Sequence, residues 1–282
     1  MRKLIKGFVM QRLFKWVLSL LPTRKEIYTT TEPILNIVPS PPDERDHGYE
    51  IKVSGAPMPS KHSIEHLFPE VKQQGSIGSC GSFGYASALE AIYKRDGEPV
   101  VELSELYHYY MVRQPEYMGT FPGDSGQYMR TGLDCARKEG FAPEALWPYI
   151  EPKWNDEPDR FAQAFARFFK IKSYHRCWSL PAIKEAIHNS LPVAIGITVK
   201  QDIYWTPRSG DLTGNGNSIG GHLVLVCGFD DTHENPDGSY GALRFKNSWG
   251  KFWGDSGYGW ISYTLLQRDL IEAWAIEAGK RE

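Results

Sequence analysis

The chain has 282 residues, of which 41% are hydrophobic and 13% aromatic, and its formal net charge is −2. Such a chain is long enough for one large hydrophobic core or two small ones, and the composition is typical of a globular protein. The charge is uneven, because residues 1–25 carry seven basic side chains and no acid, which leaves −9 for residues 26–282. Phosphate binding needs a basic surface, so this acidic body excludes nucleic acid as an expected partner.

The basic segment 1–25 also holds apolar residues at roughly helical spacing, from Leu4 to Leu21. This pattern predicts an amphipathic helix. Arg12 and Lys15 interrupt the apolar run, which argues against a cleavable signal peptide and against a membrane-spanning helix. Three interpretations stay open: a helix in peripheral contact with a membrane surface, part of an inhibitory prosegment, or a helix docked on its own domain. The sequence predicts neither a compartment nor an oligomeric state.

Residues 26–59 are rich in proline, with Pro39, Pro41 and Pro42 close together. Proline fixes φ and lacks a backbone donor, so this stretch is predicted to be an extended leader that runs over a surface. It joins the basic segment to a folded body that begins near Ser60.

Four cysteines are too few for a disulfide scaffold in a chain of this length. Cys227 lies in an apolar stretch and is expected to pack as a small buried hydrophobe, and Cys135 and Cys177 fit the same role. Neither the redox compartment nor the disulfide state of these three follows from the sequence.

Helical patterns dominate the first half of the body. A helix is predicted from Cys80 to Asp96, with Gly97 as its stop, and its many small residues favour a buried central position. Further helices are predicted over 104–112, 128–138, 161–169 and 182–188.

Strand patterns dominate the second half, over 191–199, 223–229, 241–245 and 258–262, with a turn at 235–238. Helices followed by strands predict an α+β fold with two subdomains, a helical one over about 60–180 and a β-rich one over about 181–265. Residues 266–282 are expected to form a C-terminal tail.

Three short strings hold the residue types needed for nucleophilic catalysis by a thiol. They are Gln74-Gly75-Ser76-Ile77-Gly78-Ser79-Cys80, Gly220-Gly221-His222-Leu223-Val224 and Lys246-Asn247-Ser248-Trp249-Gly250. A thiol attacks carbonyl carbon as the thiolate, so it needs a nearby base, and the base needs a group that orients its ring. An isolated cysteine or histidine is more often a core residue. Here the predicted helix start at Cys80 lowers the thiol pKa, which favours a nucleophile and, with an adjacent imidazolium, an ion pair at rest.

In chain order and local context these strings resemble the papain-like cysteine peptidases, whose triad is Cys-His-Asn. The separation of 142 residues between Cys80 and His222 lies within that family's spacing of about 130 to 150. Asn247 follows 25 residues later, beyond that spacing, and a longer turn around 230–240 is expected to absorb the excess. The resemblance covers roughly residues 60 to 265. It implies the papain fold, with the active site in the cleft between the subdomains.

The resemblance also implies a role for each site residue. Cys80 would attack a peptide carbonyl, His222 would move the proton, and Asn247 would orient His222. Gln74, with the backbone N–H of Cys80, would stabilise the oxyanion. Trp249 would shield the bond between His222 and Asn247 from water, and Gly126, Gly196 and Gly221 would border the substrate. A peptide or protein substrate is the expected partner, and no cofactor or metal is implied.

Several positions depart from the common family pattern. Many relatives carry cysteine where this chain has Ile77 and where it has about Asp124, so a disulfide common in the family cannot form here. Gly81 follows the nucleophile where an aromatic residue is usual, and Gly221 precedes the histidine where an acid or asparagine often stands. These departures indicate a branch away from the lysosomal cathepsins, toward bacterial or viral members.

The function predicted on these grounds is that of a cysteine endopeptidase, which hydrolyses peptide bonds through an acyl-enzyme. Residues 1–58 would act as an inhibitory prosegment that lies across the cleft. Two alternatives stay open: a papain-fold binding protein without catalysis, and an acyl transferase that passes the acyl group to an amine with the same triad.

Overall fold

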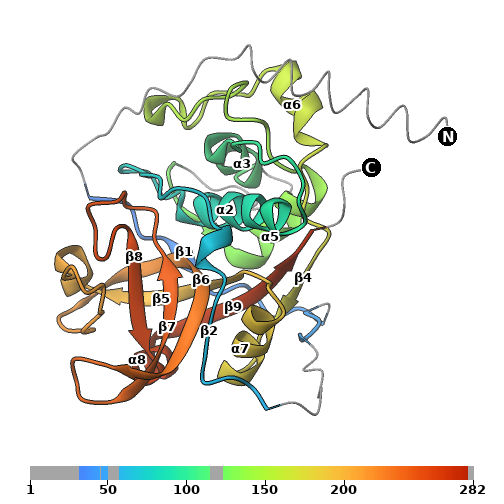
Figure 1. Cartoon of the computed structure of the whole chain (residues 1–282). Coiled ribbons are helices and arrows are strands. Elements are labelled where there is room, and N and C mark those ends of the chain that lie inside the picture. The colour runs from blue at the N-terminus through green and yellow to red at the C-terminus, as the bar shows by residue number, and fades with distance from the viewer. Residues whose placement is uncertain (1–31, 45, 50–56, 115–122, 279–282) are drawn as a thin grey trace.

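The structure is a computed structural model that describes residues 32–44, 46–49, 57–114 and 123–278. Helices α2 (Cys80–Arg95), α3 (Glu105–Val112), α5 (Met129–Lys138) and α6 (Arg160–Ala166) gather on one side, and an antiparallel sheet forms the other (Figure 1). Helices α7 (Leu180–His188) and α8 (Tyr263–Asp269) pack on the sheet, and three short 3-10 helices lie at Glu65–Leu67 (η1), Glu151–Lys153 (η2) and Gln201–Trp205 (η3). The predicted α+β fold class and the five predicted helices are confirmed.

Helix α2 is the central helix that the sequence predicts. Every residue from Cys80 to Tyr93 is buried, and the helix packs on both the other helices and the sheet. Its small residues permit this close approach, since a Cβ added at Gly84 would collide with the side chain of Leu223 in the sheet. The start of α2 is thereby held next to the strand that carries His222.

The main sheet has the strand order β4-β9-β5-β6-β7-β8, and β2 adds to β6. Its strands are all antiparallel: β2 (Lys61–Ser63), β4 (Ser173–Arg176), β5 (Val193–Lys200), β6 (Ser218–Glu234), β7 (Tyr240–Lys246), β8 (Tyr258–Ser262) and β9 (Leu270–Glu277). The predicted turn is present, with the N–H of Gly238 donating to the carbonyl of Asn235 at 2.9 Å. Because β6 and β7 are neighbours, His222 and the residue after Lys246 lie at one end of the sheet.

The structure corrects the expected C-terminal tail over 266–282. Residues 263–269 form α8, and β9 lies inside the sheet between β4 and β5. The consecutive apolar residues 273–276 of β9 are buried, with Trp274 fully inaccessible to solvent. Their burial on both faces explains the error, because such a strand lacks the alternation of apolar and polar residues and its partners are distant in the sequence.

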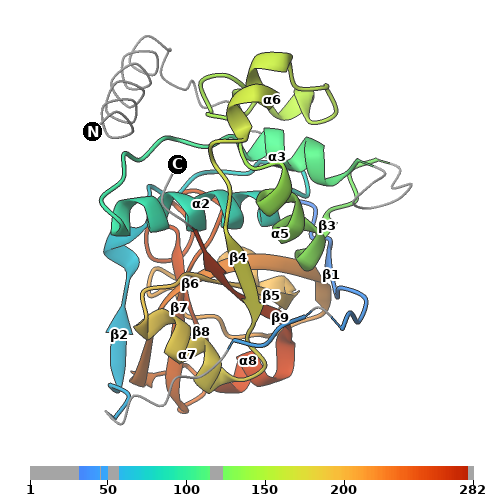
Figure 2. The same ribbon diagram turned by 90° about the vertical axis from the view of Figure 1, so that its right-hand side faces the viewer.

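The described part of the leader runs over the body in an extended form (Figure 2). Strand β1 (Ile37–Val38) pairs in parallel with β3 (Gln127–Tyr128) at the start of α5. Asn36 forms an isolated bridge with Gly221, and Gly48 forms one with Arg176. The leader is therefore bound to both halves of the body.

Two further predictions concern the chain termini and the cysteines. The amphipathic helix predicted over 1–25 lies outside the described residues. Within the described ranges, no helix combines the length and apolar character that membrane crossing requires. All four cysteines are free and buried.

Candidate active site

Cys80 is the first residue of α2, where unpaired backbone N–H groups point at the thiol. The loop that precedes Cys80 is held by hydrogen bonds to residues of the helical half. The hydroxyl of Ser79 bonds the hydroxyl of Tyr149 at 2.8 Å, and the N–H of Gly78 donates to the Asp124 carboxylate at 3.0 Å. The backbone of Leu223, the residue after His222, hydrogen-bonds the thiol from the sheet side.

His222 and Asn247 meet at the same end of the sheet. The Nε2 atom of His222 lies 2.8 Å from the Oδ1 atom of Asn247, and both side chains are buried. That oxygen also accepts from the N–H of Ser248 at 2.8 Å, which fixes its direction. Since an amide oxygen accepts, Nε2 carries the proton. The Nδ1 atom is buried and has no hydrogen-bond partner among the described residues.

Aromatic rings cover this pair. The ring of Trp249 lies 4.7 Å from that of His222, centroid to centroid, and the ring of Tyr204 stacks on Trp249 at 5.5 Å. Trp253 contacts Trp249 edge to face and donates its Nε1 hydrogen to the carbonyl of Ile203 at 2.8 Å. Three aromatic rings in mutual contact thus lie on this side of the histidine.

Burial favours the neutral forms of both Cys80 and His222 in this structure. It raises the pKa of Cys80 to about 11, although hydrogen bonds from the backbone of Leu223 and Gly81 lower it. Burial also lowers the pKa of His222 to about 4, against the hydrogen bond of Asn247, which raises it. Burial therefore opposes the expected resting ion pair in this form, because both groups are removed from solvent.

Gln74 lies in the loop that joins the two halves. Its backbone N–H donates to the carbonyl of Ser248 at 2.8 Å, and its Oε1 accepts from the Ser248 hydroxyl at 2.6 Å. Its Nε2 donates to the carbonyl of Ile77 at 3.0 Å. The glutamine is fully buried, and its orientation is fixed by these bonds.

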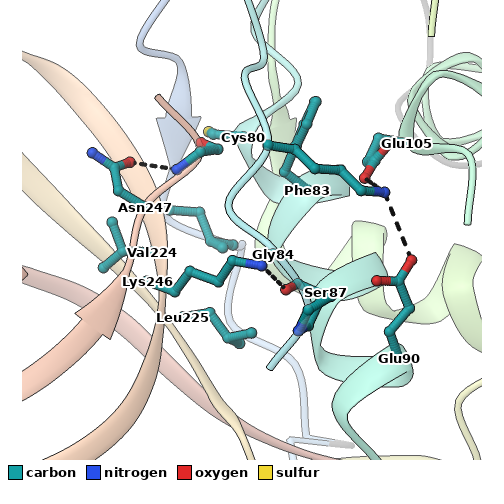
Figure 3. A pocket seen from close by; sticks show the side chains of 14 residues that line it. Cys80, Phe83, Gly84, Ser87, Glu90, Glu105, Val224, Leu225, Lys246 and Asn247 are labelled. Atoms are coloured by element: carbon teal, nitrogen blue, oxygen red, sulfur yellow. Dashed lines mark hydrogen bonds and ion pairs between the residues drawn. The ribbon is translucent and has the colours of Figure 1, made fainter. Parts of the chain in front are cut away.

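A cluster of buried charges lies in a pocket that Cys80 and Asn247 also line (Figure 3). Lys72 contacts Glu105 at 2.7 Å and Glu90 at 3.7 Å. Lys246 donates to the Ser87 hydroxyl at 2.8 Å, and burial lowers its pKa to about 7. These groups connect α2 and α3 to the strand that precedes Asn247.

The three glycines expected to border the substrate all lie against the leader. A Cβ on Gly126 would collide with the carbonyl of Asn36, and one on Gly221 would collide with the carbonyl of Ile37. A Cβ on Gly196 would meet the Ile37 side chain and the Met129 sulfur. The leader therefore lies against all three glycines, and Ile37 is only 3% exposed there.

The structure explains two of the departures from the family pattern. A Cβ on Gly81 would collide with the side chain of Gln127, so the glycine makes room for that buried side chain. The carboxylate of Asp124, near the position where cysteine is expected in many relatives, accepts from the Gly78 N–H and the Tyr109 hydroxyl. Hydrogen bonds thus join the loop of Gly78 to that of Asp124.

Several residues around the groove were not predicted. Met129, Ile271 and the leader residue Ile37 all lie against Gly196. Arg130, the next residue of α5, binds the leader through ion pairs. Met129 and Arg130 lie close in sequence to Gly126, which was predicted to border the substrate. This closeness is the signal from which they could have been predicted. Ile271 gave none, because it lies in the stretch expected to be a tail.

Comparison with known proteins agrees with this geometry. The family model described as papain family cysteine protease matches residues 60–272. The match covers the helices, the loop of Cys80 and most of the sheet. It places the chain among the cysteine peptidases, which are hydrolases that act on peptides or proteins. The chain belongs to the papain family of cysteine proteases.

Relatives in sequence include viral and animal proteins. An uncharacterized peptidase C1-like protein of Acanthamoeba polyphaga mimivirus is 29% identical over 226 residues, which cover 72% of this chain and 68% of the relative. Cathepsin S of Bos taurus is 31% identical over 197 residues, which cover 67% of this chain and 55% of the cathepsin.

Similar solved structures come from bacteria and plants. Xylellain, a cysteine protease from Xylella fastidiosa, superposes with a TM-score of 0.77 at 27% identity, over 92% of this chain and 100% of that one. The ragweed pollen protease Amb a 11, solved in its proform, gives 0.63 at 25% identity, over 80% of this chain and 67% of that one. The predicted resemblance to the papain family, and to its bacterial and viral members, is confirmed.

Proposed function

We propose that the protein is a cysteine endopeptidase that uses Cys80, His222 and Asn247. The observation that carries the proposal is the state of the His222 ring. Asn247 holds one nitrogen at 2.8 Å, Trp249 covers the ring, and the other nitrogen is left without a described partner. A histidine fixed in this way, whose neighbour Leu223 bonds the thiol at a helix start through its backbone, is suited to general-base catalysis.

In the proposed reaction the Cys80 proton moves to Nδ1 of His222, and the sulfur attacks the carbonyl carbon of the peptide. A tetrahedral oxyanion forms. When it collapses, the C–N bond breaks, and His222 gives its proton to the leaving amine. His222 then takes a proton from a water molecule, which attacks the thioester carbonyl. The C–S bond breaks, the acid product leaves, and the thiol regains its proton.

The backbone N–H of Cys80 and the side-chain amide of Gln74 are the proposed donors to the oxyanion. One N–H of the Gln74 amide donates to Ile77, and the second is left for this role. The bond from Ser248 to Oε1 supports the role, because it fixes which end of the amide carries the donors. A donor oriented in advance stabilises the transition state without reorganisation.

We also propose that the leader inhibits the peptidase by filling the substrate groove. Gly126 and Gly221 would present backbone to an extended peptide, and the pocket of Met129, Gly196 and Ile271 would take a branched aliphatic side chain. The fit of Ile37 into this pocket supports that specificity. Displacement of the leader would return solvent to Cys80 and His222 and so favour the ion pair.

Hydrolysis of fluorogenic peptides by the full-length chain tests the proposal. Ile37→Asn should loosen the leader and raise hydrolysis at least tenfold, whereas Val38→Asn, at the exposed neighbour, should change it little. Cys80→Ala in the Ile37→Asn chain should abolish turnover and leave the unfolding midpoint close to that of its parent. Turnover that survives Cys80→Ala would rule out the assignment.

A further inference from the structure

Arg130 at the start of α5 directs its whole guanidinium at the leader. Its Nε lies 2.6 Å from one carboxylate oxygen of Asp46, and its Nη2 lies 3.1 Å from the other. Its Nη1 lies 3.5 Å from the Asp43 carboxylate, and Nη2 also donates to the carbonyl of Pro41. Among the described residues, every hydrogen-bond and ion-pair partner of this side chain belongs to the leader.

A second arginine, Arg176 of β4, faces the same carboxylate. Its Nη1 lies 3.7 Å from Asp46 and 3.4 Å from Glu272. The guanidinium packs over the rings of Trp178 and Trp274, at 4.6 Å and 5.0 Å from their centroids. These groups of the body hold Arg176 in place independently of the leader.

The leader itself is anchored next to these arginines. The hydroxyl of Ser40 accepts from the backbone N–H of Arg130 at 3.1 Å. Both the N–H and the hydroxyl of Ser40 donate to the buried Glu272. Ser40 follows the pocket residue Ile37 by three positions, so an extended chain in the groove reaches Arg130 about 10 Å beyond the pocket.

The side chain of Arg130 is suited to bind a carboxylate. Its planar fork binds both oxygens of one carboxylate, and its side chain is only 16% exposed. When the leader moves away, this half-buried cation loses all of its described partners. A second carboxylate at that place would restore them, and a neutral amide would not.

Building on the peptidase function proposed above, we propose that Arg130 and Arg176 form a carboxylate-binding subsite at the end of the substrate groove. The subsite takes an acidic side chain of the peptide substrate, about three residues from the one in the apolar pocket. Asp46 of the leader fills it in the resting protein.

The test uses the full-length chain with Ile37→Asn, Asp43→Asn and Asp46→Asn, which removes the apolar anchor and both leader carboxylates. Its probes are extended peptides with one isoleucine and either aspartate or asparagine, placed three residues before or after it. We expect kcat/KM to favour aspartate by about tenfold in one of the two placements.

Two substitutions in this triple variant test whether Arg130 causes the preference for aspartate. Arg130→Gln should remove the difference between the aspartate and asparagine peptides. Arg137→Gln, on an exposed arginine of the same helix that pairs with Asp134, should keep it. Equal rates for both peptides in both placements, or a preference that survives Arg130→Gln, would overturn the subsite.

A measurement of peptide binding tests the subsite independently of the peptidase function. The same peptides, with a fluorescent label, are titrated by anisotropy against the chain that also carries Cys80→Ala. Tighter binding of the aspartate peptide supports the subsite whether or not any peptide is cleaved. Equal binding of both peptides, together with hydrolysis that depends on Cys80, would overturn the subsite and leave the peptidase function intact.

Discussion

Three contacts hold the His222 ring in one orientation. Its proposed role as a general base depends on that orientation. Asn247 accepts from one nitrogen, Trp249 lies on the ring face, and β6 fixes the backbone. These contacts fix the position of the other nitrogen, which has no hydrogen-bond partner among the described residues. A base in this setting depends on its orienting partner for the correct tautomer.

Replacement of Asn247 tests this dependence. Asn247→Ala should lower kcat at least tenfold in the Ile37→Asn chain, because the His222 ring can then adopt the wrong tautomer or rotate. KM should change less, since the amide does not contact the groove glycines. The measurement is kcat and KM as a function of pH, with Asn217→Ala, at an exposed loop position, as the control. An unchanged kcat would contradict the orienting role.

At this scale the sequence specified the candidate residues of the site better than their surroundings. The strings around Cys80, His222 and Asn247 can be recognised from a few consecutive residues, because each contains both the reactive side chain and its local context. Ile271 and Glu272 lie in a strand whose place in the sheet depends on distant partners, so their position beside the groove could not be predicted. The contacts of Arg130 with the leader depend on a path that proline content alone does not specify.

Helix α2 and strand β7 are joined by the buried charges behind the nucleophile. Lys72 lies between Glu90 and Glu105, and Lys246 reaches Ser87 from the strand. Removal of one partner from such a group leaves a buried charge without compensation, which is more costly than loss of the whole group. The cluster thus fixes α2 relative to the sheet and, with it, Cys80 relative to Asn247.

Lys72→Met should therefore destabilise the protein by about 3 to 5 kcal/mol. Lys61→Met is the matched control, because the Lys61 side chain is 67% exposed and its pair with Asp230 contributes little. Urea unfolding at neutral pH gives both values. A loss below about 1 kcal/mol for Lys72→Met would mean that the carboxylates are compensated in another way.

The helices were predicted well because each one carries its own periodicity and stop signal, as Gly97 does for α2. The sheet was predicted less completely. Strands β2, β4 and β9 were missed: β2 and β4 are short, and the buried β9 follows directly after α8. Their identity as strands depends on their neighbours in the sheet, which lie far away in the sequence.

The whole molecule buries two imidazoles in neutral form. Burial lowers the pKa of His108 to about 4, against a hydrogen bond to the Gly132 carbonyl, and lowers that of His222 to the same value. In the unfolded chain both return toward about 6.5. Between pH 6.5 and 4 the unfolded state therefore binds more protons than the folded state, and stability falls as the pH falls.

Each imidazole should contribute about 1.4 kcal/mol of lost stability per pH unit in that window. His108→Gln should remove one of the two contributions and so reduce the slope, whatever its effect on absolute stability. His66→Gln, at an exposed position, serves as the matched substitution. The check is the free energy of unfolding in urea from pH 7 to pH 4. Identical slopes for the parent and His108→Gln would be inconsistent with this origin.

The central claim is that Cys80 is a nucleophile activated by His222 and covered by the leader. Its most direct test is the rate at which an irreversible epoxide inhibitor of papain-like enzymes modifies each cysteine, followed by peptide mapping with mass spectrometry. We predict modification of Cys80 alone, slow in the parent chain, at least tenfold faster with Ile37→Asn, and lost with His222→Ala. Modification of the other buried cysteines at a similar rate, or labelling of Cys80 that does not depend on His222, would contradict the account.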